Sequence, residues 1–232
     1  MQSLPLSPSI TADSRRALWL PEHKLLAVAD LHLGYVWAHR SRGQLLPVSR
    51  EEDTVERLLE LQEDYQPERV VILGDIVHGT VSLPEVRTEL DRLINELSQR
   101  SQLTLLLGNH DHLLERNLTS LPTSVSVQRK LQVGKFLLLH GDDSRAVDGT
   151  DESLTLIMGH EHPTLSLGDG VTSEARCPCF LFSDRAVVLP AFSYWANGCT
   201  VGKQPFLSPL LEGISFTHAC AIFGQRILRV PL

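Results

Sequence analysis

The sequence has no long apolar run, few cysteines and no recognisable secretion signal, and each of these absences narrows the choice of protein class. No stretch of the 232 residues approaches the roughly 20 consecutive apolar residues that a membrane-spanning helix requires. Residues 1–16 show no basic segment followed by an apolar one, so we expect no signal peptide, no membrane attachment and a cytoplasmic location. The four cysteines include Cys177 and Cys179 in a C-x-C pair rather than the C-x-x-C spacing of redox and zinc motifs, so we expect free thiols.

An excess of positive charge is also absent. The chain has 21 Lys and Arg against 28 Asp and Glu, which gives a formal net charge of −7. Proteins that cover a large stretch of nucleic acid are usually basic, so this balance disfavours tight non-specific DNA binding. A local basic patch is compatible with it, and Arg40 and Arg42 are candidate substrate contacts. The alternative is that both arginines are solvated surface charges.

Apolar runs that lead into polar, often glycine-containing clusters recur along the chain. Uninterrupted apolar runs of this length predict strands that are buried on both faces of a sheet. Two segments between them show the apolar spacing of amphipathic helices. The first, 49–63, has Ser49 as a candidate N-cap with Glu52 three residues later, and the second, 84–98, has Pro84 in its first turn. The predicted strands are 24–29, 69–73, 103–107, 135–139 and 154–158.

From about Val125 onward the pattern is dominated by short strands. An α/β part followed by a β-rich part predicts a two-sheet β-sandwich flanked by α-helices. A chain of 232 residues is long enough for one compact domain. We therefore expect a single domain over 1–232, with its functional motifs within 30–162 and its β-rich part over 163–232. The later predicted strands are 125–127, 180–182, 186–189, 219–223 and 225–230.

Candidate metal ligands follow the ends of five predicted strands. In α/β sheets, ligands bind in the crevice outside the carboxyl ends of the strands, so these side chains should meet. Oxygen and imidazole donors without thiolates suit Mn²⁺, Fe²⁺ or Zn²⁺. The set is too large for one ion and suits two. Its members are Asp30, His32, Asp75, Asn109, His140, His160 and His162.

These motifs together resemble the signature of the calcineurin-like metallophosphoesterase superfamily. The resemblance implies a dinuclear metal site at the strand C-termini of a helix-flanked β-sandwich, in an enzyme that hydrolyses phosphate esters. Two divalent cations are implied, with Mn²⁺ as the expected ion and Fe²⁺ or Zn²⁺ as alternatives. Carried over by motif, Asp30, His32 and His162 would hold the first ion, Asn109, His140 and His160 the second, and Asp75 would bridge both. The motifs are Asp30-Leu31-His32, Gly74-Asp75-Ile76-Val77-His78, Gly108-Asn109-His110-Asp111, His140-Gly141-Asp142 and Gly159-His160-Glu161-His162.

The expected chemistry assigns roles to three further residues. Two cations about 3.5–4 Å apart clamp a phosphate and lower the pKa of a bridging water, and the resulting hydroxide would attack phosphorus. His110 is placed to donate a proton to the leaving group. Asp111 would orient the His110 ring, or alternatively cap the loop. Many phosphatases of the superfamily have Asp where this chain has His78, and a histidine there resembles the nuclease and phosphodiesterase branch; the alternative is a loop histidine with satisfied hydrogen bonds.

Other stretches are most similar to the ligase-associated DNA damage response phosphoesterases and their Icc-like relatives. This group implies a DNA-repair nuclease or phosphodiesterase that acts on DNA or RNA ends or nucleotides, with DNA-repair proteins as partners. Tyr194 and Trp195 are a candidate base-stacking platform, with packing against the sheet edge as the alternative. The similar stretches are 17–21, 30–34, 42–47 and 188–192.

Two other functions stay open at this point. A phosphomonoesterase or nucleotide hydrolase would use the same site, and relative rates on a model diester and a model monoester would separate it from a phosphodiesterase. A non-catalytic scaffold of the same fold is the third hypothesis, and a failure to bind metal would favour it. His112 and His218 match no motif position and are expected to be structural. No sequence pattern indicates the oligomeric state.

Overall fold

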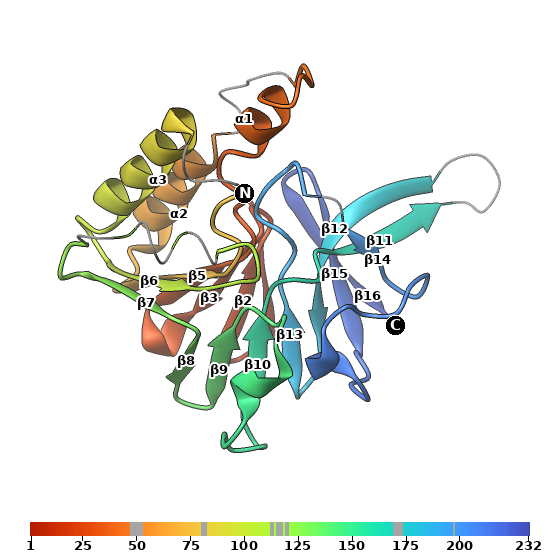
Figure 1. The fold of residues 1–232 in the computed structure, drawn as a ribbon. Coiled ribbons are helices and arrows are strands. Elements are labelled where there is room, and N and C mark those ends of the chain that lie inside the picture. The colour runs from red at the N-terminus through yellow and green to blue at the C-terminus, as the bar shows by residue number, and fades with distance from the viewer. Residues whose placement is uncertain are drawn as a thin grey trace.

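Two β-sheets pack face to face, and helices cover the outer face of the first sheet (Figure 1). The computed structural model describes residues 1–46, 53–79, 83–111, 114, 118, 121–168, 174–196 and 198–232. This architecture confirms the predicted α/β fold of two sheets with flanking helices. Within these ranges, no helix has both the length and the apolar character needed to cross a membrane.

The first sheet is antiparallel at its N-terminal edge and parallel elsewhere. Strands β1 to β4 pair antiparallel, and β4 to β7 pair parallel. Because β4, β5 and β6 run in the same direction, their carboxyl ends meet at one edge of the sheet. In sheet order the strands are β1 (Ser3–Ser7), β2 (Ile10–Asp13), β3 (Ala17–Leu20), β4 (Leu25–Val28), β5 (Arg69–Leu73), β6 (Gln102–Leu106) and β7 (Val125–Gln128).

Helices α2 (Thr54–Tyr65) and α3 (Pro84–Leu97) lie on the side of the first sheet that faces away from the second, and the short helix α1 (Tyr35–Arg40) lies beyond the ends of the strands (Figure 1). The N-cap of α2 is Asp53, whose side chain accepts hydrogen bonds from the backbone N–H groups of Val55 and Glu56. The predicted cap Ser49 and its partner Glu52 lie outside the described residues. Helix α3 agrees with the predicted segment to within one residue.

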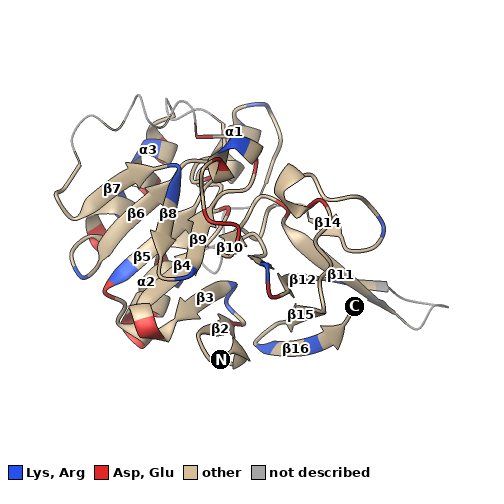
Figure 2. Ribbon diagram, turned by 90° about the horizontal axis from the view of Figure 1, so that it is seen from below, with Lys and Arg blue, Asp and Glu red and all other residues tan. Residues whose placement is uncertain are grey.

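The second sheet carries the rest of the chain. Its path runs β14-β11-β12-β13-β10-β9-β8, and β15 pairs with both β12 and β16. The β15–β16 hairpin lies beside the N-terminal strands (Figure 2), where the Arg229 guanidinium donates to the Pro5 carbonyl oxygen at 2.6 Å. The strands are β8 (Lys130–Val133), β9 (Phe136–Leu139), β10 (Thr155–Met158), β11 (Pro163–Gly168), β12 (Glu174–Phe182), β13 (Ala186–Val188), β14 (Cys199–Thr200), β15 (His218–Phe223) and β16 (Arg226–Pro231). Short 3-10 turns are η1 (Pro21–His23), η3 (Ser144–Val147) and η4 (Pro209–Leu211).

Apolar side chains fill the space between the layers. One core lies between the helices and the first sheet, where Leu58 of α2 and Leu93 of α3 pack with Ile72 of β5. A second core joins the two sheets and includes the fully buried rings of Phe136 and Phe180. Burying one such ring stabilises the fold by about 1.5–3 kcal/mol. These cores hold the strand ends of both sheets in place at the shared edge.

Candidate metal centre

The loops that follow the strands hold five candidate ligands in left-handed backbone conformations. Of the eight non-glycine residues with positive φ in the described ranges, five are candidate ligands: Asp30 (φ 56°), His32 (φ 46°), Asp75 (φ 47°), His160 (φ 70°) and His162 (φ 45°). This conformation costs roughly 1–2 kcal/mol per residue and persists where the surrounding structure enforces it, most often at functional sites. The strained turns therefore mark this edge of the sheets as a site.

Backbone pairing between two loops continues beyond the strands and fixes the first ligands. The His32 N–H donates to the Asp75 carbonyl oxygen at 2.8 Å, and the Leu33 N–H donates to Ile76 at 2.8 Å. The N–H of His78 in turn donates to the Leu33 carbonyl oxygen at 2.8 Å. The loop after β4 therefore lies along the loop after β5, which places the side chains of Asp30, His32 and Asp75 together.

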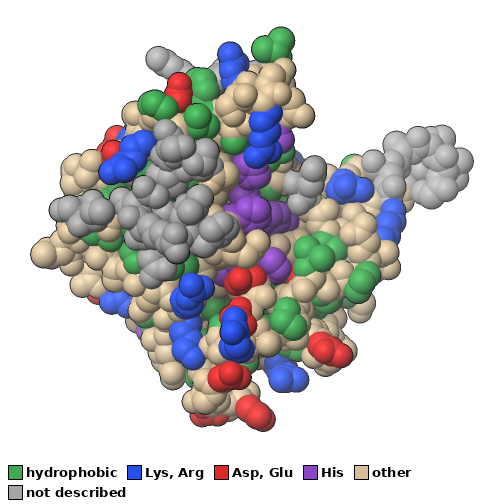
Figure 3. Space-filling model, in the orientation of Figure 1, with side chains coloured by type: hydrophobic (Ala, Val, Ile, Leu, Met, Phe, Trp, Pro, Cys, Tyr) green, Lys and Arg blue, Asp and Glu red, His purple; other side chains and the backbone are tan. Residues whose placement is uncertain are grey.

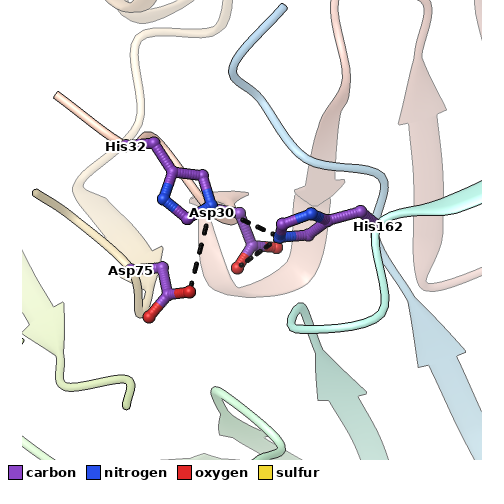
Figure 4. A group of neighbouring side chains, drawn as sticks. All are labelled: Asp30, His32, Asp75 and His162. Atoms are coloured by element: carbon purple, nitrogen blue, oxygen red, sulfur yellow. Dashed lines mark hydrogen bonds and ion pairs between the residues drawn. The ribbon is translucent and has the colours of Figure 1, made fainter. Parts of the chain in front are cut away.

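Four of the candidate ligands converge in one buried group. The donor atoms of Asp30, His32, Asp75 and His162 all lie within 4.8 Å of one another. The His162 Nε2 lies 3.4 Å from Asp30 Oδ1, and the His32 Nε2 lies 3.9 Å from Asp75 Oδ2 (Figure 4). Asp30 is fully buried and Asp75 is 3% exposed. Two carboxylates buried this closely favour a cation between them.

The other three candidate ligands form a second group on the far side of Asp75. The His140 Nε2 lies 3.0 Å from Asn109 Oδ1 and 3.2 Å from His160 Nδ1. It also lies 3.5 Å from Asp75 Oδ1, whereas the Oδ2 atom of Asp75 faces His32. The Nδ1–H of His140 donates to the Leu73 carbonyl oxygen at 2.9 Å, which turns Nε2 toward the group. Asp75 thus presents one oxygen to each group.

Burial and neighbouring charges set the protonation of these groups before any cation binds. Burial lowers the pKa of His32 to about 3, and burial also lowers the pKa of His160. Both rings are therefore neutral near pH 7, which is the form that binds a metal. Burial alone would raise the pKa of Asp30, but His162 and His140 outweigh it and hold that pKa below its ordinary value. The carboxylate is then ionised and also ready to bind.

The donor set fits two divalent cations. Carboxylate oxygens, imidazole nitrogens and an amide oxygen are ligands for Mn²⁺, Fe²⁺ or Zn²⁺. Tight glycine packing keeps these donors in place: a Cβ atom at Gly74 would lie 2.3 Å from His140 Nδ1, and one at Gly108 would lie 2.5 Å from Asp75 Oδ1. Only a residue without a side chain leaves the two ligands room at these positions.

Two further histidines stand beside the first group. The His110 side chain is 46% exposed, its Nε2 lies 3.9 Å from Asp75 Oδ2, and its backbone N–H donates to Asp75 Oδ1 at 3.1 Å. The rings of His78 and His110 stack nearly parallel, with centroids 6.1 Å apart. Burial, followed by the charges of His110, His39 and Arg42, lowers the pKa of His78 to about 4. Figure 3 shows histidines gathered in a hollow on this face of the molecule.

Asp111 connects two loops instead of contacting the His110 ring. Its Oδ2 accepts a hydrogen bond from the Gly108 N–H at 2.9 Å, and its Oδ1 accepts from Ile76 at 2.9 Å and Val77 at 3.3 Å. Burial raises the pKa of this carboxyl to about 7. No described hydrogen bond joins it to the His110 ring. The structure places Asp111 as the loop cap, the alternative that its position in the motif left open.

The sequence profile of calcineurin-like phosphoesterases matches residues 23–187 of this chain, which is more than half of it and includes all seven candidate ligands. The chain belongs to the calcineurin-like phosphoesterase family. It is therefore a hydrolase that acts on phosphate esters.

Solved structures share the fold of this calcineurin-like phosphoesterase at low sequence identity. The crystal structure of Pseudomonas putida nuclease MPE is 21% identical, with a TM-score of 0.69 over 99% of each chain. The E. coli phosphoesterase YfcE is 17% identical, with a TM-score of 0.44 over 89% of this chain and 98% of that one. No curated protein sequence matches the chain.

The four residues proposed as substrate contacts of the phosphoesterase do not lie together in one group. Arg40 and Arg42 are exposed, and the Arg40 guanidinium lies 5.7 Å from the centroid of the Trp37 ring. Tyr194 lies under two guanidinium groups, at 3.9 Å from Arg57 and 4.4 Å from Arg16. Tyr194 is nevertheless 50% exposed, and Trp195 lies parallel to Tyr35 with centroids 6.1 Å apart.

Sequence reasoning did not single out several residues at the mouth of this site. Tyr35 and His39 of α1 contact the His78 ring, with centroids 4.5 Å and 5.6 Å away. Glu161, inside the last motif, accepts hydrogen bonds from the backbone N–H groups of Leu207 and Ser208 and so attaches a distant loop to the site. The i, i+4 spacing of Tyr35 and His39 was the one sequence feature that could have placed both rings on the same face of a helix. His218 lies in β15, and His112 lies outside the described residues.

Proposed function

We propose that this phosphoesterase is a phosphodiesterase that uses two divalent cations, with Mn²⁺ as the expected ion, and acts on DNA or RNA ends or on nucleotides. Residues 1–232 would act as one catalytic domain. The observation that carries the proposal is the position of Asp75, whose Oδ2 atom faces His32 and whose Oδ1 atom faces His140. A carboxylate placed in this way could be shared by two cations about 3.5–4 Å apart.

The proposed ligands follow from these groups. Asp30, His32 and His162 would hold one cation, and Asn109, His140 and His160 the other. Bound there, the cations would supply Lewis acidity and draw negative charge from the phosphoryl oxygens as an attacking water loses its proton.

His110 and His78 would act on the substrate from the open side of the site. The half-exposed His110 ring carries Nε2 near Asp75, where it would donate a proton to the leaving ester oxygen. His78 stacks on that ring, and its Nδ1 atom is buried with no hydrogen-bond partner among the described residues. We assign His78 to confining His110 and to facing the scissile phosphate.

Room on two sides of the centre supports a diester rather than a monoester as substrate. One cavity of about 370 Å³ is lined by His32, Asp75, His110 and His160, among others. A second of about 230 Å³ lies beyond His32, between the start of α1 and Trp195. A phosphodiester carries two substituents, and each cavity can take one. The structure of the 21%-identical nuclease supports only the fold of this chain. A nuclease activity and a role in DNA repair are part of the proposal.

Hydrolysis of paired model substrates tests this function. We expect wild-type protein with Mn²⁺, Zn²⁺ or Mg²⁺ to cleave bis-p-nitrophenyl phosphate faster than p-nitrophenyl phosphate. Cleavage of the monoester alone would make the protein a phosphatase and refute the proposal.

The proton donor is tested by changing the leaving group. If His110 protonates the leaving oxygen, His110→Ala should lower the rate of thymidylyl-thymidine hydrolysis by about 10²- to 10⁴-fold, because the leaving alkoxide of this substrate needs a proton. The loss should be much smaller on the p-nitrophenyl diester, whose phenolate leaves without help. His218→Ala, a histidine in β15 outside the site, is the matched control and should change neither rate. Equal losses on both substrates would assign His110 to binding rather than to proton transfer.

A further inference from the structure

We propose that Tyr35, His39 and Trp195 form a shelf that stacks a nucleobase of the substrate beside the metal centre. The inference rests on the proposed phosphodiesterase function and deepens it, because it predicts that diesters carrying a nucleoside are preferred over diesters that do not.

The shelf begins next to the candidate ligands. The ring centroid of His78 lies 5.5 Å from that of His32, and His110 stacks on one side of His78 at an interplanar angle of 20°. His39 stacks on His78 as well, with centroids 5.6 Å apart and the same angle of 20°. Near-parallel rings therefore lead from the proposed site of phosphate chemistry out onto α1.

Helix α1 and Trp195 widen this row of rings. Tyr35 lies 4.3 Å from His39 and 4.5 Å from His78, centroid to centroid. Trp195 is parallel to Tyr35 within 11°. Tyr35, His39 and Trp195 are all partly exposed, so a planar group can reach them. The chain has three tryptophans in total, and two of them, Trp37 and Trp195, line this one region.

Contacts from neighbouring elements hold the shelf in place. The Glu89 carboxylate on α3 accepts hydrogen bonds from the Gly34 N–H and from the Trp37 indole N–H, both at 2.9 Å. Leu33, just before the helix, forms a parallel bridge with Val77. A preorganised surface loses less entropy when a ligand binds, so a shelf fixed in this way favours binding.

Size and charge select the occupant. The adjoining cavity, about 230 Å³, is below the roughly 300–1,000 Å³ of drug-sized ligand pockets, so it suits a single ring system and not a protein segment. Its lining includes the side chains of Asp53, Glu89 and Arg92 beside the aromatic rings, so it suits an uncharged base rather than a phosphate. Arg40 and Arg42 are exposed at the end of the same segment. Aromatic faces beside basic side chains are the surface that single-stranded nucleic-acid sites use, because every base has a face that stacks.

Four esters with the same leaving group test the shelf. Thymidine p-nitrophenyl phosphates, with the phosphate on the 5′ or the 3′ oxygen, carry a base. Methyl p-nitrophenyl phosphate carries neither base nor sugar, and the 5-ester of 1,2-dideoxyribose carries the sugar alone. Stacking of one base contributes about 1–3 kcal/mol, so we expect kcat/KM for one of the thymidine esters to exceed that for both base-free esters by roughly 5- to 150-fold.

Variants then assign the preference to the shelf. Tyr35→Leu and Trp195→Leu should lower the ratio of thymidine-ester to methyl-ester rates, whereas Tyr35→Phe, which keeps the ring, should preserve it. Both rates come from one preparation, so a loss of folded protein cancels in the ratio.

The possible failures are distinguishable. Equal rates on base-carrying and base-free esters, or a preference that survives both Leu variants, would overturn the shelf while leaving the phosphodiesterase intact. No hydrolysis of any of these diesters would instead refute the proposed function.

Discussion

Replacing Gly74 by alanine should disable the metal centre by moving one ligand. A Cβ atom at Gly74 would lie 2.3 Å from Nδ1 of His140 and 2.7 Å from its Cβ, whereas ordinary van der Waals contact begins at 3.4 Å. The ring must therefore move by roughly 1 Å, and its 2.9 Å hydrogen bond to Leu73 must break. A misplacement of about 1 Å costs on the order of 100-fold in catalysis.

Gly213→Ala separates this clash from backbone strain. Gly74 has φ +77° and Gly213 has φ +74°, but no atom of the described residues lies within 4 Å of a Cβ placed at Gly213. Alanine at either position costs about 1–2 kcal/mol for the left-handed backbone. Only the Gly74 variant adds an overpacking cost of about 1–3 kcal/mol.

Urea unfolding and diester hydrolysis measure the two effects. We expect Gly213→Ala to keep wild-type kcat/KM, with a free energy of unfolding lower by about 1–2 kcal/mol. Gly74→Ala should lose about 2–5 kcal/mol in total and about 100-fold in kcat/KM, with weaker Mn²⁺ binding. If the two variants behave alike, the close packing of His140 on Gly74 does not maintain the site.

Three further predictions concern the ligands and the fold. Asp75→Asn should weaken Mn²⁺ binding by at least about 100-fold in calorimetry while circular dichroism stays unchanged, since it removes the shared charge; unchanged affinity would exclude Asp75 as a ligand. Chelation by EDTA should lower Tm and added Mn²⁺ should restore it, because an ion at 100 times its Kd stabilises the folded state by about 2.7 kcal/mol. A Tm that changes with neither EDTA nor Mn²⁺ would count against a preformed metal site. Burial alone would raise the pKa of Asp13, but hydrogen bonds from Arg15 and Tyr65 outweigh burial and hold this pKa below its ordinary value of 3.8. The ionised Asp13 carboxylate therefore stabilises the fold above pH 3.8, and this stabilisation is lost as the pH falls through the lowered pKa of the folded protein. Asp13→Asn should therefore lower the free energy of unfolding by about 1–3 kcal/mol at pH 7 and by less at pH 3, and a penalty that does not depend on pH would contradict this.

The ligand motifs could be predicted from sequence because their determinants are local. Each buried strand is an uninterrupted apolar run, such as 69–73, and the polar cluster begins where the run stops. Parallel strands bring their carboxyl ends to one edge whatever the details of the loops. The convergence of Asp30 and Asp75, which follow β4 and β5 of one sheet, therefore needed no knowledge of side-chain packing. Strands β4, β5 and β6 then appeared within about one residue of their predicted bounds.

The remaining features depend on contacts between distant parts of the chain. Helix α1 has six residues and no side-chain N-cap, and it is fixed by Glu89 from α3. Tyr194 was paired with Trp195 because they are neighbours in sequence, but its ring lies against two arginines from distant parts of the chain, Arg16 and Arg57. Asp111 likewise bonds to backbone N–H groups about 35 residues earlier. Such partners leave no local pattern.

The most direct test of the account is a crystal structure of the protein grown with Mn²⁺, with an anomalous difference map. The account predicts two peaks about 3.5–4 Å apart, one among Asp30, His32 and His162 and one among Asn109, His140 and His160, with Asp75 between them. A single peak, or two peaks that Asp75 does not bridge, would contradict the central claim that these strand ends form a dinuclear centre.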